Sequence, residues 1–118
     1  MNIKVAQIGV GYWGPNLLRN LLQNPNFDIK TVVDISSNRR EFVASLYPFL
    51  NISDNEEDIF SNTEEIDAVV IATPLKSHFD LSIRALNSGK HILVEKPMVK
   101  KIEEIEEIDI VAKRNNLV

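Results

Sequence analysis

The stretch "IGVGYWGPN", residues 8–16, holds three of the four glycines of this 118-residue chain and its single tryptophan. Gly9, Gly11 and Gly14 form the pattern G-x-G-x-x-G, which follows an apolar run and opens a helical pattern. In that setting the first glycine permits a tight turn, the second lets the backbone approach a pyrophosphate, and the third allows a helix to pack closely on a strand. The stretch predicts a dinucleotide-binding loop, and the alternative is a turn with only a structural purpose.

An acidic residue stands where a dinucleotide site would need it. Asp34 ends the second apolar run, 20 positions after Gly14. A carboxylate at this place accepts hydrogen bonds from the adenosine ribose and repels a 2′-phosphate, which favours NAD over NADP. Arg39 and Arg40 keep NADP open, because an arginine nearby could accept that phosphate. We interpret both arginines as parts of a solvated helix face, and we expect NAD as the cofactor.

Short apolar runs alternate with longer helical patterns along the whole chain, as in strand–helix–strand units. The runs are apolar on both sides, which indicates strands covered by helices on both faces of a parallel sheet. We therefore predict an α/β fold, a doubly wound parallel sheet of the Rossmann type, as one domain over residues 1–118. The predicted strands are 3–9, 29–34, 67–74 and 91–97, with a short strand at 49–52, and the predicted helices are 16–22, 36–47, 75–89 and 101–116 with one or two further turns in 55–66.

Two of these helices carry apolar residues at helical spacing, which predicts their buried faces. Gly89 stands where a helix C-cap is expected. The predicted faces are Leu75, Phe79, Ile83 and Leu86 in one helix, and Ile102, Ile105, Ile108 and Ala112 in the other.

Composition excludes several classes of function. Thirteen basic and seventeen acidic residues give a net charge of −4, with no basic cluster longer than a pair, so a nucleic-acid partner is not expected. No stretch approaches the ~20 apolar residues of a membrane span, and the N-terminus does not resemble a signal peptide. The absence of cysteine excludes disulfides and thiolate metal sites and fits a reducing cytoplasm. We expect a cytoplasmic protein with no metal site and no membrane partner.

Two motifs follow the later predicted strands, at the edge where such sheets bind ligands. In "ATPLKSH", residues 72–78, Thr73 and Pro74 end a strand and His78 falls in the first turn of the next helix. In "EKP", residues 95–97, two charged residues reach the same edge. Lys96 is a plausible proton or hydrogen-bond donor to a hydroxyl or carbonyl substrate. The structural alternatives are a histidine that only supports the fold and an exposed Lys–Glu pair.

Three segments, "IGVGYWGPNLLRNL", "VVIATPLKSHFDLSIRAL" and "GKHILVEKP", resemble the N-terminal NAD(P)-binding domain of the Gfo/Idh/MocA oxidoreductases. This family includes glucose–fructose oxidoreductase and inositol dehydrogenase. The form "GYWGPN" resembles members that act on nucleotide-linked sugars. The resemblance implies a dehydrogenase that transfers a hydride between nicotinamide and a hydroxyl carbon of a sugar, polyol or nucleotide-sugar.

The resemblance also implies roles for matching residues. The three glycines would hold the pyrophosphate, Tyr12 and Trp13 would add contacts in the loop, and Asp34 would bind the adenosine ribose. On the nicotinamide side the implied residues are Thr73, Pro74, His78, Glu95 and Lys96. Lys96 would also contact the substrate near the transferred hydride, as the implied catalytic residue.

Members of this family are longer, because a second α/β domain supplies substrate contacts, further catalytic residues and the usual oligomer interface. The resemblance therefore implies a cofactor domain that is inactive alone, and a complete protein that forms a homo-oligomer. The alternative is a non-enzymatic module that senses NAD(H) and regulates a partner. Such a module has no use for "EKP", which argues for the enzyme.

Overall fold

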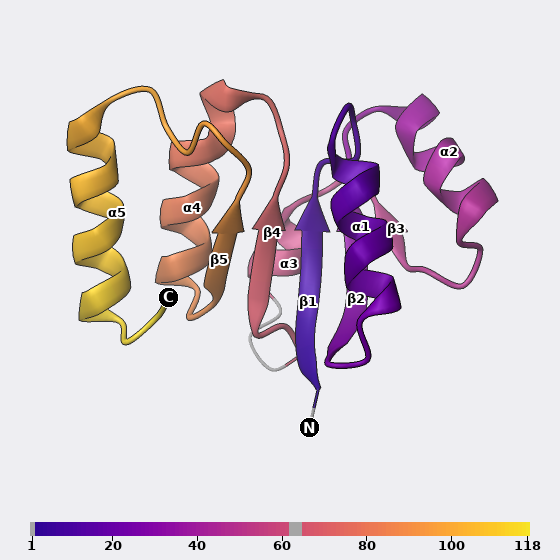
Figure 1. The fold of residues 1–118 in the computed structure, drawn as a ribbon, viewed down its shortest axis with the longest axis horizontal. Helices are drawn as coiled ribbons and strands as arrows, with labels where there is room; N and C mark the ends of the chain where they lie inside the picture. The colour runs from indigo at the N-terminus through magenta and orange to yellow at the C-terminus, as the bar shows by residue number, and fades with distance from the viewer. Residues whose placement is uncertain (1, 62–64) are drawn as a thin grey trace.

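The computed structural model describes residues 2–61 and 65–118, and these residues form a five-stranded parallel sheet flanked by helices (Figure 1). The strand order β3-β2-β1-β4-β5 reverses direction at β1, which confirms the predicted doubly wound Rossmann arrangement. The strands are β1 (Ile3–Ile8), β2 (Phe27–Val33), β3 (Ile52–Ser53), β4 (Ala68–Ile71) and β5 (His91–Val94). The helices are α1 (Gly14–Gln23), α2 (Ser37–Leu46), α3 (Glu57–Phe60), α4 (His78–Asn87) and α5 (Ile102–Arg114), with a 3-10 turn η1 (Leu75–Ser77) before α4.

The parallel pairing brings the loops after the strands to one edge of the sheet. Ile8 at the end of β1 pairs with Val33 of β2 and Ile71 of β4, and Ile71 pairs with Val94 of β5. In Figure 1 the arrowheads of β1, β4 and β5 point to the same, upper edge. The glycine stretch, Asp34 and both later motifs therefore lie at the carboxyl edge, as the sequence predicts.

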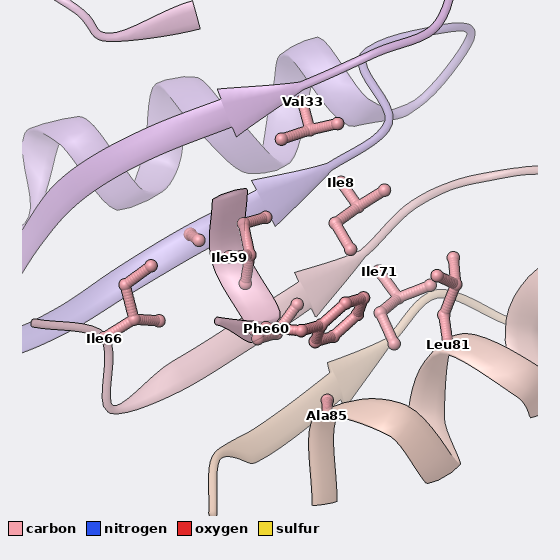
Figure 2. Close-up of a cluster of buried hydrophobic side chains, with 10 residues drawn as sticks. Ile8, Val33, Ile59, Phe60, Ile66, Ile71, Leu81 and Ala85 are labelled. Carbon is pink, nitrogen blue, oxygen red and sulfur yellow. The ribbon is translucent and has the colours of Figure 1, made fainter. Parts of the chain in front are cut away.

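Helices cover both faces of the sheet, so both sides of the central strands are buried. Figure 2 shows strand residues Ile8 and Ile71 gathered with Phe60 of α3 and Leu81 of α4 on one face. On the other face Leu18 of α1 and Val43 of α2 form a second core cluster with Val10 and Val32. This arrangement confirms the interpretation of strands that are apolar on both sides.

A third cluster joins α4 to α5 and changes the predicted helix faces. Leu86 is buried and Phe79 and Ile83 pack against Ile108 and Val111 of α5, so the predicted apolar face of α4 contacts the neighbouring helix. A different pair, Leu81 and Ala85, faces the sheet. α4 is thus buried on two sides, which a single apolar stripe does not describe.

The predicted face of α5 is wrong at its start. Ile102 is 72% exposed and Ile105 is 44% exposed, whereas Ile108 is buried together with Val111. The spacing of three residues drifts around a helix that has 3.6 residues per turn, so the first two isoleucines leave the contact with α4.

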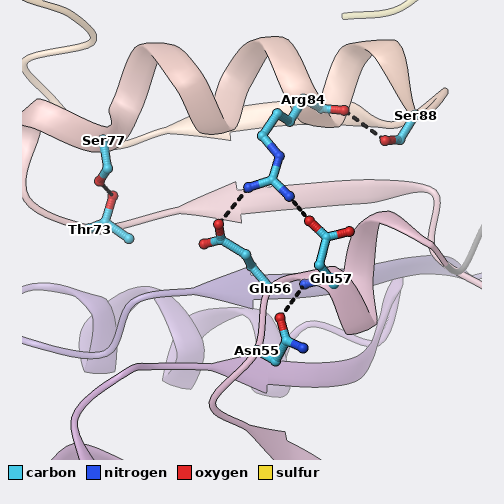
Figure 3. A network of polar contacts seen from close by, with 7 residues as sticks. All are labelled: Asn55, Glu56, Glu57, Thr73, Ser77, Arg84 and Ser88. Carbon is cyan, nitrogen blue, oxygen red and sulfur yellow. Dashed lines mark hydrogen bonds and ion pairs between the residues drawn. The ribbon is translucent and has the colours of Figure 1, made fainter.

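The segment between α2 and β4 follows the prediction in outline. β3 lies at residues 52–53, so it overlaps only the last residue of the predicted strand 49–52. α3 supplies one of the predicted helical turns, and residues 62–64 of that prediction lie outside the described residues. Arg84 of α4 holds this short helix by ion pairs with Glu56, at 2.5 Å, and with Glu57 (Figure 3). Its guanidinium lies 4.5 Å from the centre of the Phe60 ring.

A glycine and a capping serine lie at helix ends, where the sequence predicts them. Gly89 follows α4 with a φ of +78°, a backbone conformation that favours glycine after a helix. Ser36 caps α2, because its hydroxyl accepts a hydrogen bond from the backbone N–H of Arg39. Within the described residues, none of the helices is both long and apolar enough to cross a membrane.

A lysine is buried at the start of β5. The side chain of Lys90 is fully buried, and its ammonium donates to the carbonyl oxygen of Ile66 at 3.5 Å. Burial lowers the pKa of Lys90 from its usual 10.5, and the nearby charge of Asp67 opposes that shift.

Lys90 should make stability depend on pH in the alkaline range. Because its pKa is lower in the folded state, the unfolded chain binds more protons just below pH 10.5, so the free energy of unfolding should rise with pH there. We expect the stability of the parent chain to increase relative to that of Lys90→Met as the pH approaches 10.5, measured by urea unfolding of both. If the difference in free energy of unfolding between the two chains stays constant with pH, the buried Lys90 is not the source of the pH dependence.

Candidate functional site

The three glycines of the loop after β1 differ in why they must be glycine. A Cβ added at Gly9, whose φ is +98°, would lie 2.5 Å from the carbonyl oxygen of Ala72. A Cβ added at Gly14 would lie 2.4 Å from the carbonyl oxygen of Gly9. A Cβ at Gly11 would meet nothing within 4 Å. The fold therefore requires Gly9 and Gly14, whereas the bare backbone of Gly11 leaves room for an approaching ligand.

A buried glutamine of β1 holds the two ends of this loop together. The side-chain amide of Gln7 donates to the carbonyl oxygens of Gly9, at 3.0 Å, and Gly14, at 2.8 Å. The backbone N–H of Gly9 donates to Val33 of β2 at 2.8 Å, so the loop is also tied to the neighbouring strand. Sequence reasoning missed Gln7, and the signal that could have found it is a glutamine among the apolar residues of a predicted strand. The structure shows that its side chain is fully buried.

Replacing Gln7 should loosen the loop and destabilise the fold. Gln7→Leu leaves two carbonyl oxygens without this donor, and we expect the free energy of unfolding to fall by about 1–3 kcal/mol. Chemical denaturation of Gln7→Leu and Gln7→Glu measures the effect. Glu has nearly the same shape but places an acceptor against the carbonyls, so it should be at least as destabilising; a stable Gln7→Glu would contradict this role.

Asp34 lies beside the loop, half-buried at the end of β2. One carboxylate oxygen accepts the backbone N–H of Val10 at 2.9 Å, and the other accepts that of Ser36 at 2.9 Å. A carboxylate has about four acceptor positions, so capacity remains for ribose hydroxyls. The next residue, Ile35, is 88% exposed and offers an apolar surface beside the carboxylate that sequence reasoning did not single out.

The interpretation of Arg39 and Arg40 as a solvated face is wrong. Arg39 donates to the carbonyl oxygens of Val10, at 2.8 Å, and Gly11, at 3.0 Å, and its guanidinium lies 4.6 Å from the centre of the Phe42 ring. Arg40 donates to the backbone carbonyl of Asp34 at 2.8 Å. Both arginines are half-buried and brace the backbone around the loop, because the turn into α2 brings them back onto it.

The loop after β4 begins next to the glycine loop. The N–H of Ala72 donates to Ile8 at 2.8 Å, and the hydroxyl of Thr73 accepts a hydrogen bond from Ser77 at 2.6 Å (Figure 3). Pro74 is exposed at the start of η1. Thr73 and Pro74 thus lie at the carboxyl edge, as predicted.

His78 is buried at the carboxyl edge, and its predicted place on the nicotinamide side stays a prediction. The side chain is only 2% exposed, and both ring nitrogens contact backbone carbonyl oxygens. Its ring lies between the loops that follow β4 and β5, so it supports this edge from within.

The residues after β5 present the predicted lysine at the surface. The N–H of Glu95 donates to Ile71 of β4 at 2.9 Å, and its carboxylate accepts the backbone N–H of Lys96 at 3.0 Å. Lys96 is exposed, and the peptide bond between Lys96 and Pro97 is cis. In the loop after β1, Tyr12 is 97% exposed and Trp13 is 51% exposed.

The strand order, the glycine loop and the acidic residue after β2 together define a Rossmann-type nucleotide-binding domain. Comparison with known proteins agrees. The family model GFO_IDH_MocA, described as "Oxidoreductase family, NAD-binding Rossmann fold", matches residues 3–118, and the chain belongs to this family.

Individual relatives show the same similarity. The chain is 36% identical over 105 residues to scyllo-inositol 2-dehydrogenase (NAD(+)) of Bacillus subtilis, covering 86% of this chain and 30% of that protein. It is 31% identical over 104 residues to scyllo-inositol 2-dehydrogenase (NADP(+)) IolW of the same organism, covering 86% and 29%. A crystal structure of an NAD-binding protein from Listeria innocua superposes with a TM-score of 0.91 at 34% identity, covering 99% of this chain and 34% of that one. The chain thus spans about a third of the length of the relatives it matches.

Proposed function

We propose that this chain is the cofactor-binding part of an NAD-dependent dehydrogenase that acts on a CH–OH carbon of a sugar or polyol. The observation that carries the proposal is the open space over Gly11, next to the start of α1 and the carboxylate of Asp34. The fold itself does not need a glycine at position 11, so a residue without a side chain there points to a ligand that touches the backbone. The two Bacillus relatives, whose names state an inositol dehydrogenase, support the substrate class.

The loop and β2 would hold the adenosine diphosphate half of the cofactor. The backbone N–H groups around Gly11 and the positive end of the α1 dipole would face a pyrophosphate. Asp34 would accept the ribose hydroxyls, and Ile35 would cover one face of the adenine. Tyr12 and Trp13 are exposed in the same loop and free to pack on the bound dinucleotide.

The two later loops would form the nicotinamide half. Thr73 and Pro74 lie on one side, and Glu95 and Lys96 lie on the other. When bound, the cofactor supplies a hydride acceptor or donor. The Lys96 ammonium would donate a hydrogen bond to the substrate oxygen and take part in moving the substrate's proton. The backbone of Lys96 is anchored at the edge, because its N–H donates to the carboxylate of Glu95.

Preference for NAD over NADP follows from the charges around the ribose position. Asp34 would repel a 2′-phosphate, and the hydrogen bonds that Arg39 and Arg40 donate are directed at backbone carbonyls. A cytoplasmic location stays a prediction from composition, and a homo-oligomeric complete protein stays a prediction of the family resemblance.

Titration with NADH and NADPH tests the proposal. We expect Trp13 emission to fall saturably with NADH, through energy transfer to the nicotinamide, and to fall only at higher NADPH concentrations. Trp13→Phe is the control, because the chain then has no tryptophan. Its binding is followed by the fluorescence polarisation of the nicotinamide of NADH. If neither nucleotide binds the folded chain, the glycine loop does not hold a dinucleotide in it, and the proposal fails.

A further inference from the structure

The hydrogen bonds of the glycine loop are divided unequally between its carbonyl oxygens and its N–H groups. Among the described residues, no atom accepts a hydrogen bond from the backbone N–H groups of residues 11–14. Hydrogen bonds from within the chain reach most of the carbonyl oxygens of this stretch, those of Gly9, Val10, Gly11, Trp13 and Gly14. The loop therefore uses its acceptors inside the fold and keeps its donors for a partner from outside.

Arg39 holds the two carbonyl oxygens in the middle of this loop. Its Nε donates to Val10 at 2.8 Å, and its Nη2 donates to Gly11 at 3.0 Å. These oxygens belong to two consecutive trans peptide units, in which the C=O and the N–H point in opposite directions. The N–H groups in the same two units are those of Gly11 and Tyr12. Both therefore point away from the guanidinium.

The backbone of Gly11 does not hold this orientation by itself. A glycine adopts positive and negative φ almost equally well, so the peptide units on either side of it can rotate at little cost. Such a rotation would turn a carbonyl oxygen, in place of an N–H, toward an anion. Arg39 itself is fixed, because Ser36 accepts its backbone N–H at 3.3 Å and its guanidinium lies 4.6 Å from the centre of the Phe42 ring.

We propose that Arg39 is a positioning residue for the pyrophosphate, which orients the N–H groups of Gly11 and Tyr12 without contacting the phosphates itself. The guanidinium suits this purpose, because its rigid, planar fork of donors can hold two neighbouring carbonyl oxygens at once. The inference rests on the proposed function, since it names the residue that prepares the loop for the dinucleotide.

Residual dipolar couplings of the ¹⁵N-labelled chain test the orientation without any ligand, because they report the direction of each backbone N–H bond. In Arg39→Met we expect the couplings of Gly11 and Tyr12 to change. The coupling of Val10 should stay as in the parent, because the carboxylate of Asp34 holds its N–H. Unchanged couplings of Gly11 and Tyr12 would overturn the proposal.

Binding of adenosine and of ADP tests the consequence, because the two ligands differ by the diphosphate group alone. We expect Arg39→Met to bind ADP about tenfold more weakly than the parent, as for one lost hydrogen bond to a charged group, and to bind adenosine equally well. Arg19→Met is the matched control, because it removes an equal charge from the exposed side of α1 and should bind ADP as the parent does. Equal weakening of both ligands in Arg39→Met, or equal weakening of ADP in both variants, would overturn the positioning role.

Arg39→Lys separates orientation from charge and decides the question if Arg39→Met does not fold. Lysine keeps the positive charge and an apolar stem, but its ammonium has no planar fork. We expect changed couplings of Gly11 and Tyr12 and weaker binding of ADP than in the parent. If Arg39→Lys binds ADP as tightly as the parent, charge alone attracts the anion and the positioning role fails. Failure of the parent to bind ADP would reject the proposed function instead, and the dipolar couplings would still decide whether Arg39 orients the loop.

Discussion

Gly11→Ala is expected to lose most of its affinity for NADH while its stability stays close to that of the parent. A Cβ at this position meets no atom of the chain within 4 Å, so the free energy of unfolding should change by no more than about 0.5 kcal/mol. The same Cβ would occupy the space through which a pyrophosphate reaches the backbone. Loss of one or two hydrogen bonds to a charged group corresponds to an affinity about 10- to 100-fold weaker.

Gly14→Ala is the matched control, because the same methyl group is added three residues later in the same loop. Its Cβ would lie 2.4 Å from the backbone oxygen of Gly9, where neither atom can move easily. We expect it to lower the free energy of unfolding by about 3 kcal/mol or more, through overpacking against backbone. Urea unfolding and NADH titration of both variants separate the two effects. If Gly11→Ala binds NADH as tightly as the parent, the loop is a turn and not a ligand site.

The glycine motif could be predicted from sequence because its signals are local. Gly9 and Gly14 follow a strand and open a helix, and Asp34 stands at the expected distance. Apolar runs of strand length, separated by helical patterns, were enough to predict the doubly wound sheet. The carboxyl edge followed from the parallel order of the strands, so Thr73 and Lys96 were placed at the right edge without any contact being known.

The supports of the site could not be predicted, because they join segments distant in the sequence. Arg39 reaches Val10 and Gly11 across 28 or more positions, and the Arg84 contacts with α3 span 27 or more. A helical pattern shows that such a side chain leaves the helix, but not which backbone it meets. For the same reason, the interpretation of Arg39 and Arg40 as solvated was wrong, because their partners are backbone carbonyls at and beside the glycine loop.

Each of the two predicted helix faces was correct only in part. α4 packs on both the sheet and α5, and the pattern showed only the face toward α5. In α5 the regular isoleucines extend beyond the contact, so Ile102 and Ile105 are exposed. Periodicity reports the rotation of side chains about a helix axis, while burial also depends on where the neighbouring element ends.

Asp34→Ser is expected to reverse the preference between NADH and NADPH. The parent carboxylate would accept two ribose hydroxyls, and charge-assisted bonds of this kind are worth about 1.5–3 kcal/mol each. Removing the negative charge also removes the repulsion of a 2′-phosphate. The ratio of NADH to NADPH affinity should therefore fall by about 100-fold, measured by parallel titrations.

Two further variants separate the charge of Asp34 from its contacts with the backbone. Asp34→Asn keeps the shape and one acceptor oxygen for the N–H of Val10 or Ser36, but it carries no charge. It should gain affinity for NADPH as Asp34→Ser does, because the repulsion is lost in both. Asp28→Ser removes an acid from the start of the same strand, where it pairs with Lys30 at 2.8 Å, and should leave both affinities unchanged. If Asp34→Asn binds NADPH as weakly as the parent, then charge at this position does not select the cofactor, and the shape of the loop around Val10 and Arg39 must do so.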